Sequence, residues 1–391
     1  MSAIPAGYKQ TEVGVIPEDW TARKLGELAS FRTGPFGSAL HKADYTSDGV
    51  PIVNPMHIID GELITSRSMT VTESAATKLA EFRLSPDEVV IGRRGDMGRC
   101  AVVRHEHAGW LCGTGSMIVR PSPQMDARFL QRVLSSSTAI SAIEDSSVGS
   151  TMINLNQGTL RDLVVQAPPL PEQRAIAAAL SDVDALLAKL DQLIAKKRDL
   201  KQATMQQLLT GQTRLPGFSG AWEVKRLGDV LRVRHGRNQN NVETVGGQFP
   251  ILATGGEIGR TDTFLYDKPS VLIGRKGTID KPQFRDEPFW TVDTLFYTEI
   301  LGANSAEFLF YKFCAIDWRS YNEASGVPSL NASTIEGIEV KLPQSEEQTA
   351  IAAVLSDMDA ELATLEARRD KTRALKQGMM QELLTGRIRL V

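Results

Sequence analysis

Apolar residues recur alternately four and three positions apart in two long segments of the chain. They are Ile176, Leu180, Val183, Leu187, Leu190 and Ile194 in the first segment, and Ile351, Leu355, Met358, Leu362 and Leu365 in the second. This alternation is typical of the contact face of a coiled coil, because it keeps one stripe of a helix apolar over many turns. We therefore predict two long helices, within residues 170–215 and 345–391, whose apolar faces pair.

Both predicted helices have recognisable ends. Pro171 suits the first helical position, and the spacing of Ser345 and Gln348 is that of a capping box. Gly211 and Gly386 each follow the tripeptide LLT, where a glycine can adopt the left-handed conformation that closes a helix. At about 1.5 Å per residue, each helix should be about 60 Å long.

The helices belong to an internal repeat. Residues 172–215 align without a gap to residues 347–390, with 27 identities in 44 positions. Upstream of each helix, Trp20 and Trp222 begin weaker matches at a different offset, so the middle of each half differs in length. We expect both tryptophans to be core anchors. The chain thus consists of a first variable domain (1–169), a central long helix (170–215), a second variable domain (216–344) and a C-terminal long helix (345–391).

The repeat favours one of two possible arrangements of the helices. A single helix of this kind is typical of a dimerisation zipper, but two in one chain can pair with each other and give the monomer a pseudo-two-fold axis. The variable domains mix short β-rich runs with Gly and Pro turns, which indicates mixed α/β domains. The predicted fold class is α+β (mixed α/β), with two globular domains separated by two long helices that form an antiparallel coiled coil.

A basic, glycine-containing loop follows one β-rich run in each variable domain: GRRGDMGR at 92–99 and GRKGTIDK at 274–281. Glycine allows close backbone approach, and arginine donates two hydrogen bonds to phosphates or guanine, whereas Asn and Gln pair with adenine. The alternatives are a tight solvated turn and, for the Asn run, a hairpin tip. The candidate DNA-contacting residues are Arg32, Ser38, Lys42, Arg93, Arg94 and Arg99 in the first domain, and Arg234, Arg237, Asn238, Gln239, Asn240, Asn241, Arg275, Lys276 and Lys281 in the second.

Composition limits how such loops could act. The net charge is −3, residues 20–170 hold 15 basic and 15 acidic side chains, and residues 216–345 hold 14 and 16. A nucleic-acid surface must therefore be a local patch, or a partner must supply positive charge. No apolar run approaches the roughly 20 residues of a membrane span and no secretory signal is evident, so we expect a cytoplasmic protein. The three cysteines fit no disulfide or metal framework, and we expect them to be reduced core residues.

Motifs for catalysis are missing from the sequence. There is no phosphate-binding P-loop motif, and no cluster of carboxylates and lysine of the nuclease type is evident. Asn54 and Pro55 match the start of an amino-methyltransferase motif, but Met56 and His57 replace the proline and aromatic residue that should follow. We expect a chain that is not catalytic by itself and binds no metal.

With these features the chain closely resembles the DNA-specificity (S) subunits of type I restriction-modification systems. The resemblance covers nearly all of the chain and rests on PPLPEQRAIA (168–177), the two LLTG endings with their trailing RL, TEVGVIPEDW (11–20), PGFSGAWEVKRLGDV (216–230) and GPFGSAL (34–40). It implies two target recognition domains, each reading one half of a bipartite, asymmetric site in double-stranded DNA, and helices that set the spacer and dock two methyltransferase subunits. It also implies that S-adenosylmethionine, ATP and Mg²⁺ bind to partner subunits, namely the adenine methyltransferases and the restriction/translocase subunits.

Two alternatives remain open at this point. The chain could serve a related system in which methylation and cleavage share one polypeptide, or it could be a coiled-coil assembly scaffold that does not bind DNA. The scaffold would show no preference between DNA sequences.

Overall fold

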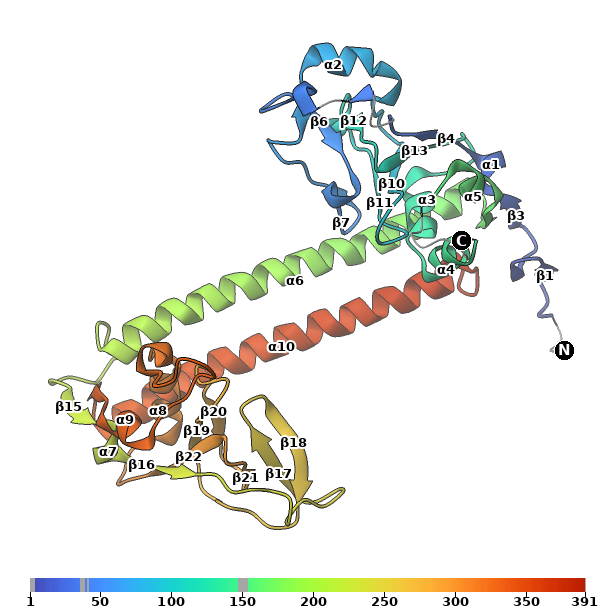
Figure 1. The fold of residues 1–391 in the computed structure, drawn as a ribbon. Helices are drawn as coiled ribbons and strands as arrows, with labels where there is room; N and C mark the ends of the chain where they lie inside the picture. Colours follow the sequence, from blue (N-terminus) through green and yellow to red (C-terminus); the bar gives the residue numbers. More distant parts are fainter. Residues whose placement is uncertain (1–3, 36–38, 41, 147–153, 391) are drawn as a thin grey trace. The chain divides into compact units, whose positions relative to one another are not determined.

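The chain forms two compact units. The computed structural model describes residues 4–35, 39–40, 42–146 and 154–390. The first unit comprises Met1–Lys189 and Arg369–Val391, and the second is the continuous segment Leu190–Arg368. Each unit therefore contains one end of both long helices, α6 (Leu170–Thr210) and α10 (Ser345–Leu384), which are labelled in Figure 1.

The long helices end where the sequence predicts, but one of them starts differently. Gly211 and Gly386 have φ values of +73° and +69°, so both adopt the left-handed conformation that closes a helix. The capping box predicted for Ser345 and Gln348 is wrong. The Ser345 hydroxyl contacts the adjacent Glu346 at 3.2 Å, whereas the Gln348 side chain turns inward and bonds to the Pro343 carbonyl at 3.0 Å. The expected cap is not formed because the Gln348 side chain is taken up by this buried carbonyl and Ser345 bonds to its exposed neighbour instead.

The predicted contact residues of both helices are all buried or partly buried. Their apolar faces continue into the cores of the two units. The start of α6 joins the first core through Ile176 and Leu180, and its end joins the second core through Met205, Leu208 and Leu209. The start of α10 joins the second core through Ile351 and Leu355, and its end joins the first core through Leu383 and Leu384. Since burying one such side chain contributes about 1.5–3 kcal/mol, both units depend on both helices.

Ion pairs show that the helix segments within each unit are antiparallel. In the second unit, Lys197 pairs with Glu361 at 2.7 Å, and Lys201, four residues further on, pairs with Asp359. In the first unit, Lys376 of α10 pairs with Asp184 of α6 at 2.6 Å. The predicted antiparallel pairing is confirmed within each unit.

The first unit is built around two four-stranded sheets. One has the order β11-β10-β13-β4 and is antiparallel, and the other has the order β12-β6-β9-β5, in which β12 and β6 are parallel. Their strands are β4 (Ala29–Thr33), β5 (Tyr45–Thr46), β6 (Val50–Val53), β9 (Thr70–Val71), β10 (Val89–Gly92), β11 (Cys100–Val102), β12 (Leu111–Cys112) and β13 (Ser116–Pro121). Three strand pairs complete the unit: β1 (Tyr8–Thr11) with β2 (Gly14–Pro17), β3 (Thr21–Lys24) with β14 (Val164–Ala167), and β7 (Ile58–Ile59) with β8 (Glu62–Leu63). The short helices are α1 (Leu25–Leu28), η2 (Lys42–Asp44), η3 (Pro55–His57), α2 (Glu73–Lys78), η4 (Ala80–Phe82), η5 (His105–His107), α3 (Ala127–Leu134), α4 (Ser137–Asp145) and α5 (Gln157–Asp162).

The second unit repeats this plan, except that its other sheet has three strands instead of four. An antiparallel sheet has the order β16-β22-β19-β20, and a three-stranded sheet has the order β18-β17-β21. Their strands are β16 (Leu231–His235), β17 (Phe249–Ala253), β18 (Gly256–Thr261), β19 (Ser270–Gly274), β20 (Gln283–Arg285), β21 (Trp290–Thr291) and β22 (Leu295–Ile300). The remaining elements are β15 (Glu223–Arg226), paired with β23 (Glu339–Leu342), and α7 (Leu227–Val230), α8 (Ala306–Cys314), η6 (Trp318–Tyr321) and α9 (Ala332–Gly337). The mixed α/β class and the internal repeat are confirmed.

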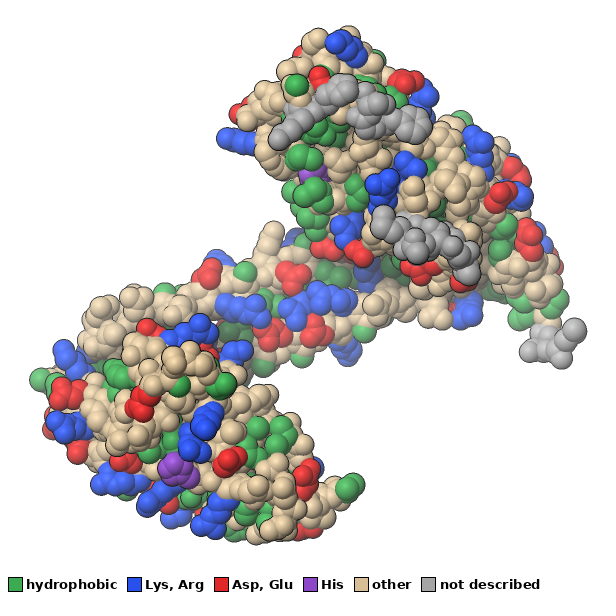
Figure 2. Space-filling model, viewed as in Figure 1, with side chains coloured by type: hydrophobic (Ala, Val, Ile, Leu, Met, Phe, Trp, Pro, Cys, Tyr) green, Lys and Arg blue, Asp and Glu red, His purple; other side chains and the backbone are tan. Residues whose placement is uncertain are grey.

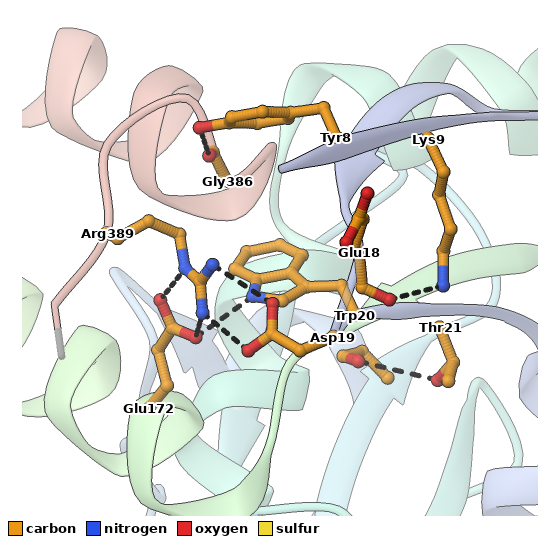
Figure 3. Close-up of polar contacts among 10 residues, drawn as sticks. Tyr8, Lys9, Glu18, Asp19, Trp20, Thr21, Glu172, Gly386 and Arg389 are labelled. Atoms are coloured by element: carbon orange, nitrogen blue, oxygen red, sulfur yellow. Dashed lines mark hydrogen bonds and ion pairs between the residues drawn. The ribbon is translucent and has the colours of Figure 1, made fainter. Parts of the chain in front are cut away.

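A buried carboxylate at the start of α6 joins three parts of the first unit. Glu172 is 3% exposed and accepts hydrogen bonds from Arg389 at 2.7 and 2.9 Å and from the Trp20 indole at 2.9 Å. Arg389 also donates to both oxygens of Asp19, at 3.0 and 2.7 Å (Figure 3). These bonds lower the pKa of Asp19 and raise the pKa of Arg389. The tail after α10 is thereby fixed to the start of the first domain.

The same arrangement recurs in the second unit with one difference. Arg214, in the tail after α6, pairs with the buried Glu347 at 2.5 and 2.6 Å and lies 5.8 Å from the Trp222 ring. The Trp222 indole nitrogen is buried and has no hydrogen-bond partner among the described residues. Instead, Lys312 lies 5.9 Å from this ring and donates to the Leu209 carbonyl at 2.9 Å, and burial lowers the Lys312 pKa to about 8. The prediction that Trp20 is a core anchor is confirmed, whereas Trp222 is only partly buried.

None of the helices in the described parts of the chain has the length and apolarity needed to cross a membrane.

Two of the three cysteines occupy the core positions expected from the sequence. Cys100 and Cys112 are buried, and burial raises the pKa of Cys100 to about 12. The core position expected for Cys314 is wrong, because this residue ends α8 at the surface.

Replacing Arg389 with alanine should destabilise the first unit, because Glu172 would remain buried without a cation. We expect the free energy of unfolding to fall by about 2–4 kcal/mol. Hydrogen exchange at the amides of β3 and β14 measures this loss. Arg387 is the matched control, since it pairs with Glu382 at 3.3 Å and its side chain is 60% exposed. The Arg387→Ala variant should change the free energy of unfolding by less than about 0.5 kcal/mol. Equal effects of the two substitutions would contradict the role given to Glu172.

Candidate nucleic-acid interface

The two basic loops occupy equivalent positions in the two units. The first loop (92–99) follows β10 and the second (274–281) follows β19. In the first, the Leu155 amide donates to the Arg93 carbonyl at 2.9 Å, and in the second the Leu330 amide donates to the Arg275 carbonyl at 2.9 Å. Leu155 and Leu330 are 175 positions apart, which is the offset of the long-helix repeat (172–215 and 347–390), so the same backbone frame holds both loops.

Gly34 and Gly236 lie 14 residues after Trp20 and Trp222, so they occupy matching positions in the two halves of the chain. Both allow close approach of two backbone segments. A Cβ atom on Gly34 would lie 1.9 Å from the Gly113 carbonyl oxygen, and one on Gly236 would lie 2.0 Å from the Val292 carbonyl oxygen. Neither position therefore accepts a side chain without moving backbone. This close packing explains why a glycine recurs after β4 and after β16.

In the first loop, Arg93 is held by the protein, whereas Arg94 is free to contact a ligand. Arg93 is partly buried and donates from Nε to the Leu155 carbonyl at 2.9 Å, and both burial and the nearby Arg94 lower its pKa. Arg94 is exposed and makes no hydrogen bond or ion pair with the described parts of the chain. Two guanidinium groups so close together favour a bound anion, and Arg94 is the one positioned to contact it.

Two other candidate arginines of the first unit already have partners. Arg99 pairs with Asp96 and donates to the Pro55 carbonyl at 3.4 Å. Arg32 pairs with Glu81 at 2.5 Å. Of the remaining candidates, Ser38 lies outside the described residues, and for Lys42 only its position at the start of η2 is described.

The candidate residues on strands and loops of the second unit also divide into those with partners in the protein and those that are exposed. Arg275 donates to the Asp293 carbonyl at 3.2 Å, and Arg234 pairs with Glu299 at 2.8 Å. Lys276 and Lys281 are exposed. Lys276 follows Arg275 as Arg94 follows Arg93, so an exposed cation stands at the same place in both loops.

The segment from Arg237 to Asn241 forms a turn beside the three-stranded sheet. Arg237 is exposed, and its carbonyl accepts a hydrogen bond from the Trp290 indole at 2.9 Å. The Asn238 side chain accepts from the Asn240 amide at 2.8 Å, whereas Asn240 and Asn241 are exposed and Gln239 is partly buried. The turn is therefore anchored at Arg237, closed by an internal hydrogen bond, and presents Arg237, Asn240 and Asn241 to solvent.

This arrangement suits an anionic polymer with hydrogen-bonding edges. Exposed Lys and Arg side chains occur on the visible faces of both units, interspersed with Asp and Glu (Figure 2). In the part of the chain that the structure describes, no three His, Cys, Asp or Glu side chains gather in a way that could hold a metal ion. The candidate interface can contact phosphates through Arg94 and Lys276 and base edges through the Asn residues.

Sequence reasoning missed an exposed apolar group next to the first loop. Met56, Ile59 and Ile64 are 64%, 46% and 52% exposed. They lie in and around a hairpin of two-residue strands, which is too short for the alternation of apolar and polar positions to reveal its outer face.

Comparisons with known proteins give a consistent result. A family model described as the type I restriction modification DNA specificity domain matches residues 17–197 and again residues 220–372. A Methanocaldococcus jannaschii protein named as the type I restriction enzyme MjaX specificity subunit is 24% identical, covering 98% of this chain and 97% of that protein. The solved structure of a type I restriction-modification S subunit from M. genitalium aligns with a TM-score of 0.64 at 18% identity, covering 93% of this chain and 96% of that one. A chain from a structural study of type I R-M complex assembly aligns with a TM-score of 0.57 at 16% identity, covering 95% and 99%. The two structures establish a shared fold.

Arg94 should contribute more to binding of duplex DNA than its partnered neighbours. Replacing it with alanine removes one cation, so we expect the slope of log affinity against log salt to flatten by about one unit. Titrations of duplex DNA at several salt concentrations measure the slope. Lys24, which pairs with Asp162 at 2.9 Å on the β3–β14 side of the unit, is the control and should leave it unchanged when replaced with alanine. An unchanged slope in the Arg94→Ala variant would exclude a phosphate contact by this residue.

Proposed function

Because the chain belongs to the family of type I restriction modification DNA specificity domains, we propose that it gives such a complex its DNA sequence specificity and has no catalytic activity of its own. The observation that carries the proposal is the recurrence of one backbone frame in two units whose exposed loop residues differ. Arg94 and Lys276 stand at matching places, whereas the Arg237–Asn241 turn has no basic counterpart in the first unit's GPFGSAL segment. Each unit would read one half of a bipartite, asymmetric site in double-stranded DNA.

The long helices provide the surface proposed for two methyltransferase subunits. In the second unit, Leu193 and Leu200 lie seven residues apart on α6 and are 40% and 51% exposed. Positions seven apart fall on nearly the same face of a helix, so these two leucines form an exposed apolar stripe within the second unit. An apolar stripe on a helix that already has one packed face supports docking of partner helices.

The catalytic components would lie on partner subunits. We propose that methyltransferase subunits bind S-adenosylmethionine and methylate adenine, and that restriction/translocase subunits use ATP and Mg²⁺. The balanced charge of both variable domains supports this division, since a specificity subunit with little net positive charge needs partners to neutralise DNA phosphates.

Exchanging one variable domain tests the proposed division of the site. Replacing residues 216–343 with the corresponding segment of a relative should change one half-site and leave the other intact, because the first unit's loops are untouched. A map of methylated adenines in cells expressing the exchanged chain with its methyltransferase gives both half-sites. Changes in both halves, or in neither, would contradict the proposal.

Lengthening α6 tests whether the helices set the spacer. Four residues inserted after Lys196 add about one turn, roughly 6 Å, to this helix. Since base pairs are about 3.4 Å apart, the unread spacer should grow by about one or two base pairs while both half-sites stay the same. The methylation map of this variant provides the measurement, and an active variant with the original spacer would show that distance is set elsewhere.

A further inference from the structure

The exposed side chains of Met56, Ile59 and Ile64 form an apolar patch on the first unit. Ile59 pairs with Glu62 across the β7–β8 hairpin, and the Ile64 amide donates to the carbonyl of His57, the residue after Met56, at 2.8 Å. Figure 2 shows hydrophobic side chains gathered on the surface at the place where Figure 1 labels β7. Single exposed apolar residues are common on protein surfaces, but three within nine positions form a patch that indicates a binding surface.

The hairpin that carries the patch is held firmly. Its inner residues, Ile58 and Leu63, are 1% and 6% exposed and belong to a core cluster with Val90 and Ile118. The turn between the strands uses positive φ angles at Asp60 and Gly61, of 50° and 80°. Glu62 on the outer side is neutralised by an ion pair with Arg104. The apolar side chains are therefore presented by a rigid element.

The patch is joined directly to the first basic loop. Pro55 is packed against two glycines, so that an added Cβ on Gly115 would lie 2.8 Å from the proline ring and one on Gly92 would lie 3.2 Å from it. The Pro55 carbonyl also accepts a hydrogen bond from Arg99 at 3.4 Å. Met56 is the next residue, so its backbone lies beside the start of the loop that exposes Arg94.

We propose that Met56, with Ile59 and Ile64 around it, is a DNA-contacting surface of the first unit that touches base edges next to the phosphate bound by Arg94. This inference rests on the proposed function and adds an apolar element to it. Apolar side chains contact thymine methyl groups or wedge between base steps, whereas cations bind phosphates. A groove of DNA offers charged phosphates next to apolar groups on the base edges. The exposed Arg94 and the apolar patch joined to its loop could contact the two kinds of group at the same time. A protein partner would match the patch but would leave the charge of Arg94 unused.

The test uses the complex of the full chain with its methyltransferase subunits. The exchange of residues 216–343 identifies the half-site read by the first unit, as the half that does not change. Binding is then measured on the specific duplex and on duplexes altered at one base pair of that half-site at a time. The Met56→Ala variant should lose about tenfold in discrimination at one or two adjacent base pairs. Its salt slope and its assembly with the methyltransferase subunits should be unchanged.

Two control variants separate this effect from a general loss of structure. Met56→Leu keeps an apolar side chain of similar volume and should restore discrimination. Val245, which is fully exposed on the second unit, should have no effect on the first half-site when replaced with alanine.

The outcomes are distinct. Full discrimination in the Met56→Ala complex overturns the inference, and so does loss of assembly with unchanged discrimination, because the patch would then be a protein interface. If the unaltered complex shows no preference between DNA sequences, the proposed function itself fails, whatever the variant does.

Discussion

The carboxylates of Glu172 and Glu347 are 3% and 2% exposed, and charges removed from water to this extent persist only beside a cation and further hydrogen-bond donors. In both units the cation comes from a distant part of the chain. Arg389 reaches Glu172 across 217 positions, and Arg214 reaches Glu347 across 133. The start of each long helix therefore needs the tail that follows the other long helix. This requirement joins the ends of α6 and α10 within each unit, and it explains why the RL dipeptide belongs to the repeat.

The candidate interface also uses structural elements that recur in both units. A repeated frame, with its two close-packed glycines and the Leu155 and Leu330 amide bonds, places a loop at one position in each unit. The frame leaves the exposed side chains free to differ, so Arg94 and Lys276 carry charge at the same place while their surroundings diverge. A specificity protein needs this separation, because substitutions that change the recognised DNA sequence must not disturb the backbone that supports the recognition loops.

The sequence predicts the long helices well and the interface less well. Repeat and apolar spacing locate α6 and α10 because both signals are local in the chain. Whether an arginine is free to contact DNA depends on residues far away in the sequence. Arg32 pairs with Glu81, which lies 49 positions away, and Arg93 bonds to the Leu155 carbonyl. The same limit explains two errors. The cap at Ser345 is not formed because its expected partner Gln348 bonds to the buried Pro343 carbonyl, and Cys314 lies at the surface at the end of an apolar helix. Met56 occupies a position of an incomplete catalytic motif in the sequence, and only the structure shows that its side chain is exposed and that the preceding Pro55 packs against Gly92 and Gly115.

The division of the chain between the two units has a consequence for synthesis on the ribosome. The second unit is one continuous segment, Leu190–Arg368, whereas the first needs both Met1–Lys189 and Arg369–Val391. The domain that is made first is thus the last to be completed, since Glu172 has no cation until Arg389 has emerged from the exit tunnel. Until then, the nascent first domain has an open core where Leu383 and Leu384 will pack, and apolar surface left open in this way favours aggregation.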